Sequence, residues 1–401
     1  MGNPAAIVHD LPIVLGRLSA GAHAVLIGFG KEGERMEHAD LLPRDTAIQL
    51  IDADGRVVED ERYALPDAEA LLAAYRGLVE GRRINDQASA LVRQGRLAVY
   101  PSSHGQEACQ IGVALALSDD DWLFPTYRDS VAVVARGVAP ADAMVLLKGD
   151  WHSGYDVRAH HVAPQATPLA TQLLHAVGFA YAAKRRGEST VVVALCGDGA
   201  TSEGDFHEAM NFAAVFHVPV VFFVQNNEFA ISVPLSRQTA APSLAHKAIG
   251  YGMPGQRLDG NDVAAVLAVL GDAVDRARAG GGPTLIEAHT YRMQAHTNAD
   301  DDTRYRERAE VQAWVARDPL TRLRTYLTGT GALTEELEAE YADRAEQTAA
   351  AMREALNTDA DIDPEDLFRF VTESRSPQRE EQWHLLRGEI ERTHEPAGGA
   401  R

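Results

Sequence analysis

Two short runs of β-branched and other apolar residues constrain the fold of this chain most. Residues 191–195 and 218–224 contain no charged side chain and do not alternate between polar and apolar positions. That pattern is typical of strands that are buried on both faces of a sheet. Between them, residues 205–216 place apolar side chains at helical spacing. The order strand, helix, strand predicts a parallel pair of strands.

The same alternation extends through the middle of the chain. Apolar residues recur every fourth position from Leu169 to Tyr181, and a basic triplet precedes Gly187, so we expect a helix that ends at this glycine. Residues 66–94 and 261–279 have helical patterns, and residues 284–291 have the composition of a strand. The predicted fold class is α/β, a doubly wound parallel sheet with helices on both faces.

The flanking regions carry weaker patterns. Between residues 46 and 65, a turn sequence at residues 52–55 lies between apolar pairs and suggests a hairpin. Residues 28–33 resemble a phosphate loop but lack Ser or Thr after the lysine, which favours a surface loop. Residues 337–356 form an amphipathic stripe, and Asp363-Pro364 is typical of a helix start. We therefore expect an N-terminal extension (1–65), an α/β domain (66–310) and a helical C-terminal region (311–401).

Composition excludes several classes of partner. The formal net charge of −20 over 401 residues opposes binding to nucleic acid or to an anionic membrane surface. The apolar N-terminal stretches are interrupted by Arg17 and His23, so neither a signal peptide nor a spanning helix is expected. Of the two cysteines, Cys196 falls in a predicted buried strand, so we expect no disulfide framework and a reducing, cytoplasmic setting.

Polar residues follow two of the predicted strands directly. Gly197-Asp198-Gly199 follows the first, and Asn226-Asn227 ends the second. The carboxyl ends of parallel strands meet at one edge of a sheet, which is where open α/β sheets bind ligands. An aspartate and an amide oxygen are ligands that magnesium accepts, and the glycines allow the backbone to approach a diphosphate at the N-terminus of the next helix. The alternative is a tight turn and a polar strand end without a ligand.

Together these two motifs resemble the fingerprint of thiamine diphosphate enzymes. Over roughly residues 46–390, the sequence resembles the alpha subunit of the decarboxylating component of branched-chain 2-oxo acid and pyruvate dehydrogenase complexes. The segments that carry it are residues 124–128, 167–172, 197–206, 225–232 and 290–306. The resemblance implies the thiamine diphosphate-binding fold for the α/β domain.

The resemblance also implies a set of ligand-binding residues. Magnesium would be held by Asp198, Asn227 and the carbonyl of Phe229. Other cofactor contacts would come from Tyr127, Arg128, Thr167, Leu169, Gly199, Ala200 and Gln225. A potassium ion would lie at Ala166, Pro168, Thr171 and Gln172. Two positions depart from relatives: Ala166 replaces a serine, which weakens the potassium assignment, and Gln225 replaces an arginine, so it can donate to phosphate but brings no charge.

Histidines complete the implied active site. His296 lies just past a predicted strand and matches the active-site histidine of the family, where it can donate to an oxyanion or move a proton. His152 is the candidate for a second catalytic histidine, with His160 and His161 as alternatives. The charged segment 300–306 resembles the loop that closes over the cofactor, and Thr297 occupies a position that some relatives phosphorylate.

The implied activity needs a second chain. In the resembled family a glutamate that activates the cofactor belongs to a beta subunit, and we find no candidate for it in this sequence. We therefore expect an α2β2 heterotetramer that decarboxylates a 2-oxo acid oxidatively and transfers the acyl group to the lipoyl group of an acyltransferase core.

The preferred substrate is less constrained. Residues 167–172, 176–185 and 383–386 resemble branched-chain members and favour 2-oxoisovalerate, with pyruvate as the alternative and acetoin as a third. A hypothesis of another class is a non-catalytic nucleotide-binding module. Against this hypothesis, the sequence has no G-x-G-x-x-G pattern after the predicted strand, and nucleotide binding alone does not explain Asn227 or His296.

Overall fold

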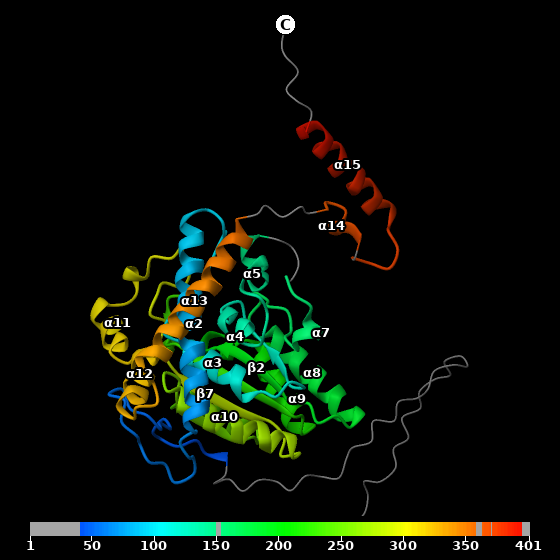
Figure 1. Ribbon diagram of the computed structural model, residues 1–401. Coiled ribbons are helices and arrows are strands. Elements are labelled where there is room, and N and C mark those ends of the chain that lie inside the picture. Colours follow the sequence, from blue (N-terminus) through cyan, green and yellow to red (C-terminus); the bar gives the residue numbers. More distant parts are fainter. Residues whose placement is uncertain (1–40, 150–153, 358–362, 370, 395–401) are drawn as a thin grey trace, which may run out of the picture. The chain divides into compact units, whose positions relative to one another are not determined.

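A parallel five-stranded sheet forms the centre of the protein, as a computed structural model shows (Figure 1). The structure describes residues 41–149, 154–357, 363–369 and 371–394. The strand order is β1-β2-β3-β7-β6. The strands are β1 (Trp122–Phe124), β2 (Val192–Gly197), β3 (Val220–Asn226), β6 (Gly255–Asp259) and β7 (Thr284–His289), and a separate short pair joins β4 (Phe229–Ala230) to β5 (Val233–Pro234).

The three central strands confirm the sequence predictions, whereas the two edge strands were missed. Strand β1 has only three residues, and β6 has the mostly polar sequence Gly-Gln-Arg-Leu-Asp. Neither gives the long apolar run that identifies a doubly buried strand. Both are recognisable only through their partners, since β1 pairs with β2 and β6 pairs with β7.

Helices cover both faces of the sheet, as the unbroken apolar strands predict. In β2, Val192, Ala194 and Cys196 belong to a core shared with α8 and α9. The alternate residues Val193 and Leu195 belong to the core on the opposite face, shared with α3 and α10. These helices are α3 (Glu107–Ala116), α8 (Thr171–Arg186), α9 (Gly204–Val215) and α10 (Val263–Arg278). The predicted fold class is therefore confirmed.

The predicted end of α8 is also confirmed. Gly187 adopts a left-handed conformation with φ of 75° and caps the helix, which only glycine does without strain. Lys184 lies in the last turn and donates to the carbonyls of Phe216 and His217. The helix is thereby tied to the end of α9.

A further group of helices packs outside α3. Helix α2 (Ala68–Arg93) lies beside α13 (Glu335–Leu356), and Met352 and Leu356 of α13 pack with Ile84 and Leu91 of α2 (Figure 1). The predicted stripe over 337–356 is therefore confirmed. The remaining helices are α4 (Ser130–Ala135), α5 (Pro140–Ala143), α6 (Val145–Lys148), α7 (Val157–His160), α11 (Arg308–Val315), α12 (Pro319–Gly329), α14 (Asp366–Arg369) and α15 (Pro377–His394).

A helix follows Asp363-Pro364, as predicted: α14 begins at Asp366 and has four residues. The Asp363 carboxylate accepts the N–H of Glu365, and the Asp363 carbonyl accepts the N–H of Asp366. A capping side chain makes such a bond to the N–H two or three residues ahead of it. The capping role predicted for Asp363 is therefore confirmed.

The segment before α2 forms the expected hairpin and adds to the sheet edge. Ile51 pairs with Val57 across the turn at residues 52–55, and Ile48 pairs in parallel with Leu258 of β6. The buried carboxylate of Asp262 accepts the N–H groups of Leu50 and Ile51 at 2.6 and 2.8 Å. The glycines of residues 28–33 lie outside the described residues.

Two further expectations concern the chain as a whole. Both cysteines are buried and free, which confirms that they form no disulfide framework. Within the described ranges, no helix combines the length and apolar character that crossing a membrane would need.

Candidate active site

The carboxyl edge of the sheet brings the two predicted motifs together. Gly197, the last residue of β2, pairs with Gln225 of β3, so Asp198 and Asn227 leave adjacent strands side by side. Asp198 then enters a short 3-10 helix (Asp198–Ser202) that leads into α9. Both residues line a cavity of about 230 Å³ at this edge. The predicted juxtaposition of the two motifs is confirmed.

The cavity collects most of the other predicted residues. Those that line it are Tyr127, Arg128, Ala166, Pro168, Leu169, Gln172, Gly199, Ala200, Gln225, Phe229 and His296. Thr167 and Thr171 do not line it: Thr167 is exposed, and the Thr171 hydroxyl donates to Asp205. His152 lies outside the described residues. His160 and His161 do not line the cavity, and the His161 ring stacks on Trp122 instead.

Asp198 is a buried carboxylate without a cationic partner among the described residues. Its exposed fraction is 1%, and Oδ2 accepts a hydrogen bond of 2.6 Å from Gln238 Nε2. Burial raises the pKa of this carboxyl, and the Gln238 hydrogen bond opposes the rise. An ionised group in this position is destabilised unless a cation accompanies it.

Gly199 lets the loop approach its neighbour closely. A Cβ at this position would lie 2.7 Å from the Cβ of Ala230, so a side chain here would displace the segment that follows β3. That segment is itself strained: Glu228 and Ile231 have φ of 74° and 56°, in the left-handed region that such residues rarely adopt. Glu228 lies between Asn227 and Phe229, and Ile231 lies two residues after Phe229.

Contacts from β7 and the loop after it hold this strained segment. His289 Nε2 lies 2.5 Å from the Glu228 carboxylate. The Arg292 guanidinium donates to the carbonyls of Phe229 and Ile231 at 3.4 and 2.7 Å. Arg292 lines the cavity and was not identified from the sequence. Its position four residues before His296 is a helical or turn spacing, but only the fold shows that it reaches the β4 segment.

His296 is held by two arginines. Arg128 Nη2 lies 2.9 Å from His296 Nδ1 and 3.0 Å from its carbonyl oxygen, and Arg292 Nη1 lies 3.3 Å from Nδ1. A guanidinium can only donate, so Nδ1 accepts and the proton of the neutral ring is on Nε2. Burial, with the charges of Arg128 and Arg292, lowers the pKa of His296 to about 4. Near pH 7 the ring is a neutral hydrogen-bond donor.

The charged loop after His296 is anchored to it. Asp300 Oδ2 accepts from the His296 N–H at 2.8 Å and from the Tyr305 hydroxyl at 2.5 Å. Tyr305 also accepts from Arg292 Nη2 at 2.8 Å. These hydrogen bonds lower the pKa of Asp300 although some burial opposes them. Arg292, His296, Asp300 and Tyr305 therefore form one hydrogen-bonded unit.

A buried cluster of polar side chains lines the cavity, and two of its members, Gln106 and Asp129, were not identified from the sequence. Gln225 Nε2 donates to Asp129 at 2.6 Å, and Gln106 contacts both Gln225 and Asn227. Burial raises the pKa of Asp129, and the donors around it, from Thr126 and Gln225, oppose the rise. Gln106 and Asp129 lie outside the strand-end motifs, so nothing in the local sequence pattern singles them out.

The donor set suits a hard divalent cation with a diphosphate. Asp198 supplies one carboxylate, Asn227 one amide oxygen and Phe229 one carbonyl, and magnesium typically combines such oxygens with waters and phosphate oxygens. The described residues contain no cluster of three or more His, Cys, Asp or Glu side chains that could hold a metal by themselves. Arg128 and the start of the helix after Asp198 offer cationic and N–H donors for phosphate oxygens.

Comparisons with known proteins agree with this geometry. The family model described as the dehydrogenase E1 component matches residues 76–362. The chain is 48% identical over 365 residues to the 3-methyl-2-oxobutanoate dehydrogenase subunit alpha of Mycobacterium tuberculosis, which covers 90% of this chain and 99% of that protein. It is 40% identical over 315 residues to the pyruvate dehydrogenase E1 component subunit alpha of Staphylococcus aureus, which covers 78% and 85% respectively. The chain therefore belongs to the dehydrogenase E1 component family of thiamine diphosphate-dependent oxidoreductases.

Proposed function

We propose that this protein is the alpha subunit of a branched-chain 2-oxo acid dehydrogenase. It would oxidatively decarboxylate 3-methyl-2-oxobutanoate (2-oxoisovalerate) and related acids and transfer the acyl group to a lipoyl carrier. The observation that carries the proposal is the placement of Asp198 and Asn227 beside one cavity in a chain with 48% identity to a 3-methyl-2-oxobutanoate dehydrogenase alpha subunit. Pyruvate is the second candidate substrate, supported by the 40% identity to a pyruvate dehydrogenase subunit.

In this proposal the chain binds the charged end of thiamine diphosphate. Asp198, Asn227 and the Phe229 carbonyl hold magnesium, and Gly199 and Ala200 lie along the diphosphate. Arg128, Tyr127 and Gln225 donate to phosphate oxygens, while Leu169 and Thr167 contact the rest of the cofactor. The bound cofactor supplies the carbanion chemistry of decarboxylation. The protein's part is to neutralise, orient and desolvate.

His296 would act as a donor rather than as a cationic acid. With Nδ1 turned toward Arg128, the Nε2–H is the group available to an anionic oxygen of the substrate or cofactor. A neutral ring with its pKa lowered to about 4 donates this hydrogen bond over the whole physiological range. His152 remains the candidate for a second catalytic histidine.

Other parts of the proposal concern ions and organisation. A potassium ion would bind around Ala166, Pro168, Thr171 and Gln172, of which three line the cavity.

The chain would divide into three parts, with boundaries at residues 65 and 310. Two buried free cysteines support a reducing, cytoplasmic setting.

The active enzyme would contain a second chain. Among the described residues, the two buried carboxylates that line the cavity are Asp129 and Asp198. Asp129 accepts from Gln225 and Thr126, and Asp198 is assigned to magnesium in this proposal, which leaves neither to activate the cofactor's ring. We propose that a glutamate of a beta subunit does so in an α2β2 heterotetramer, which delivers acyl groups to a lipoyl-bearing acyltransferase core. The relatives are themselves named as alpha subunits.

Calorimetry and kinetics on the chain co-purified with its beta subunit test the proposal. Magnesium-dependent binding of thiamine diphosphate that is lost in Asp198→Ala supports it, and tighter binding of NAD would refute it. Steady-state rates should be higher for 3-methyl-2-oxobutanoate than for pyruvate or acetoin. A higher kcat/KM for pyruvate would transfer the assignment to pyruvate dehydrogenase, because a methylene or two changes binding by only about 1–3 kcal/mol.

A further inference from the structure

We propose that Gln106 is a positioning residue that turns the amide oxygen of Asn227 toward the magnesium site, through a one-way chain of amides that starts at Asp129. The inference rests on the proposed magnesium site and gives a role to Gln106 and Asp129, which neither the strand-end motifs nor the family resemblance singled out. The chain runs through the buried side chains of Asp129, Gln225, Gln106 and Asn227, which are between 0% and 6% exposed.

Each link of the chain has one donor and one acceptor. Gln225 Nε2 donates to Asp129 Oδ1 at 2.6 Å. Gln106 Nε2 donates to Gln225 Oε1 at 3.3 Å. Asn227 Nδ2 donates to Gln106 Oε1 at 3.1 Å. Every amide therefore accepts a hydrogen bond on its oxygen and donates one from its nitrogen, and these bonds all run in the same direction.

The direction of the chain is set at its buried end. Asp129 Oδ2 accepts from the Thr126 N–H and hydroxyl at 2.7 and 2.6 Å, and Oδ1 also accepts from Gln110 at 3.1 Å. The backbone N–H of Thr126 can only donate, so Oδ2 is an acceptor. With the carboxylate ionised, Oδ1 is an acceptor as well, and a flipped Gln225 would place its amide oxygen against Oδ1 without a proton between them. The orientation of Gln225 in turn fixes Gln106 and then Asn227.

The last amide is the one that matters for metal binding. Asn227 has one nitrogen and one oxygen, and only the oxygen is a magnesium ligand. With Nδ2 committed to Gln106, Oδ1 is left on the opposite side, where the Phe229 N–H approaches it at 3.3 Å. A residue that orients a metal ligand in this way typically changes metal affinity by about 10–100-fold when it is replaced.

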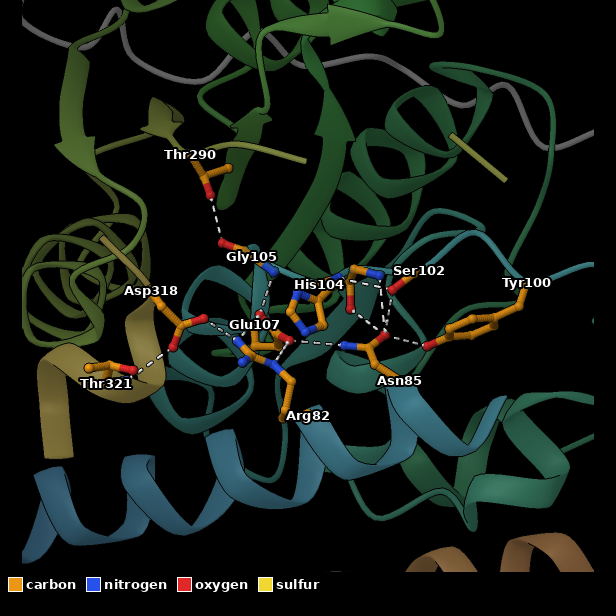
Figure 2. Close-up of polar contacts among 11 residues, drawn as sticks. Arg82, Asn85, Tyr100, Ser102, His104, Gly105, Glu107, Thr290, Asp318 and Thr321 are labelled. Atoms are coloured by element: carbon orange, nitrogen blue, oxygen red, sulfur yellow. Dashed lines mark hydrogen bonds and ion pairs between the residues drawn. The ribbon is translucent and has the colours of Figure 1, made fainter. Parts of the chain in front are cut away.

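Several contacts fix the loop that carries Gln106, which the hydrogen-bonded chain of amides requires. Figure 2 shows Glu107, whose carboxylate accepts from the Gly105 N–H at 2.7 Å and pairs with Arg82. Thr290 donates to the Gly105 carbonyl at 3.0 Å. At Gly105, with φ of 96°, a Cβ would lie 2.6 Å from the carbonyl oxygen of Tyr291. Gln106 therefore projects from a backbone fixed on both sides.

Matched substitutions test the proposal in the complete enzyme. Gln87 of α2 is the control, because it is a buried amide whose oxygen accepts from Arg83 and Arg353 and which has no hydrogen bond to Asp129, Gln225, Gln106 or Asn227. Both Gln106→Met and Gln87→Met remove one amide of equal size. At saturating thiamine diphosphate, we expect the magnesium dissociation constant to rise about 10-fold or more in Gln106→Met and to stay within about 2-fold in Gln87→Met.

A second readout separates orientation from general damage. In Gln106→Met, excess magnesium should restore kcat, because a misoriented ligand weakens binding of the ion without removing the site. A defect in folding would instead lower kcat at every magnesium concentration. Equal magnesium affinity in the two variants, or a loss of kcat that excess magnesium does not restore, would overturn the proposal.

A variant at Asp129, where the hydrogen-bonded chain of amides begins, covers the case in which Gln106→Met does not fold. Asp129→Asn keeps the shape but adds donors, which allows Gln225, Gln106 and Asn227 to flip in turn. We expect weaker magnesium binding, and unchanged affinity in a folded Asp129→Asn protein would contradict the proposal. If the wild-type enzyme binds thiamine diphosphate without magnesium, the proposed function fails instead.

Discussion

At the scale of single residues, the site contains groups that suit ligand binding but lower the stability of the fold. Asp198 has a raised pKa because it is buried, so its ionised form is disfavoured in the folded state relative to the unfolded chain. Functional sites commonly hold such charges at a cost to the fold. The same is true of the strained backbone at Glu228 and Ile231.

Asp198→Asn tests this trade. The neutral isostere avoids burying a charge, so at pH 7 we expect the free energy of unfolding without ligands to rise by about 1 kcal/mol. Urea unfolding followed by circular dichroism measures it. The stabilisation that magnesium and thiamine diphosphate give the wild type should be absent. A variant that is destabilised without ligands would show that Asp198 has a structural partner instead.

His296 predicts a pH dependence of stability. Its pKa of about 4 in the folded protein lies below the usual 6.5, so between these values the unfolded chain binds more protons than the folded one. Stability should therefore rise as pH increases through this window and fall on acidification from about 6.5 to 4. The slope of unfolding free energy against pH should be smaller in His296→Gln. An identical slope in the two proteins would contradict the neutral, buried ring.

At the scale of elements, one buried ion network joins three helices. Arg82 of α2 pairs with Glu107 of α3 and with Asp318 at the start of α12, each at 2.7 Å. Figure 2 shows the two carboxylates on either side of the guanidinium. The Glu107 side chain is 1% exposed, so removal of its partner leaves a charge that water does not solvate.

The neighbouring arginine provides the control. We expect Arg82→Ala to lower the free energy of unfolding by about 3 kcal/mol or more. Arg83→Ala removes a pair with Glu346, whose side chain is 58% exposed, and a hydrogen bond to Gln87, and it should cost much less than Arg82→Ala because water solvates the carboxylate that is left. Urea denaturation of both variants measures the difference. Similar losses would mean that burial of Glu107 does not govern the strength of its pair.

At the scale of the whole molecule, the sheet separates two cores that are expected to unfold together. Cys109 of α3 lies in the core on one face and Cys196 of β2 in the core on the other, and both are fully buried. Burial raises the pKa of each thiol, which further slows reaction with thiol reagents. The two thiols are therefore reporters for opposite faces.

Pulsed thiol labelling at increasing urea concentration measures this cooperativity. With the single-cysteine variants Cys109→Ala and Cys196→Ala, both remaining thiols should become reactive at the same midpoint, because the shared strands tie the cores together. Separate midpoints would show that one face opens before the other.

Part of this protein follows from local sequence alone. The strands at 192–197 and 220–226, the helix between them and the juxtaposition of Asp198 with Asn227 depend on periodicity and on chain direction, which a few neighbouring residues encode. The capping of α8 by Gly187 belongs to the same class. Such features are recognisable without knowledge of the partners that they meet.

Other features are decided only in three dimensions. The edge strands β1 and β6, the reach of Arg292 to the Phe229 carbonyl, and the link from Asp129 to Gln225, 96 positions apart, depend on contacts between distant segments. Local pattern specifies which strands and which polar side chains reach the edge of the sheet, because neighbouring residues encode periodicity and chain direction. The atom that each of these side chains presents depends on hydrogen bonds and burial from distant segments, because those contacts form only in the folded protein.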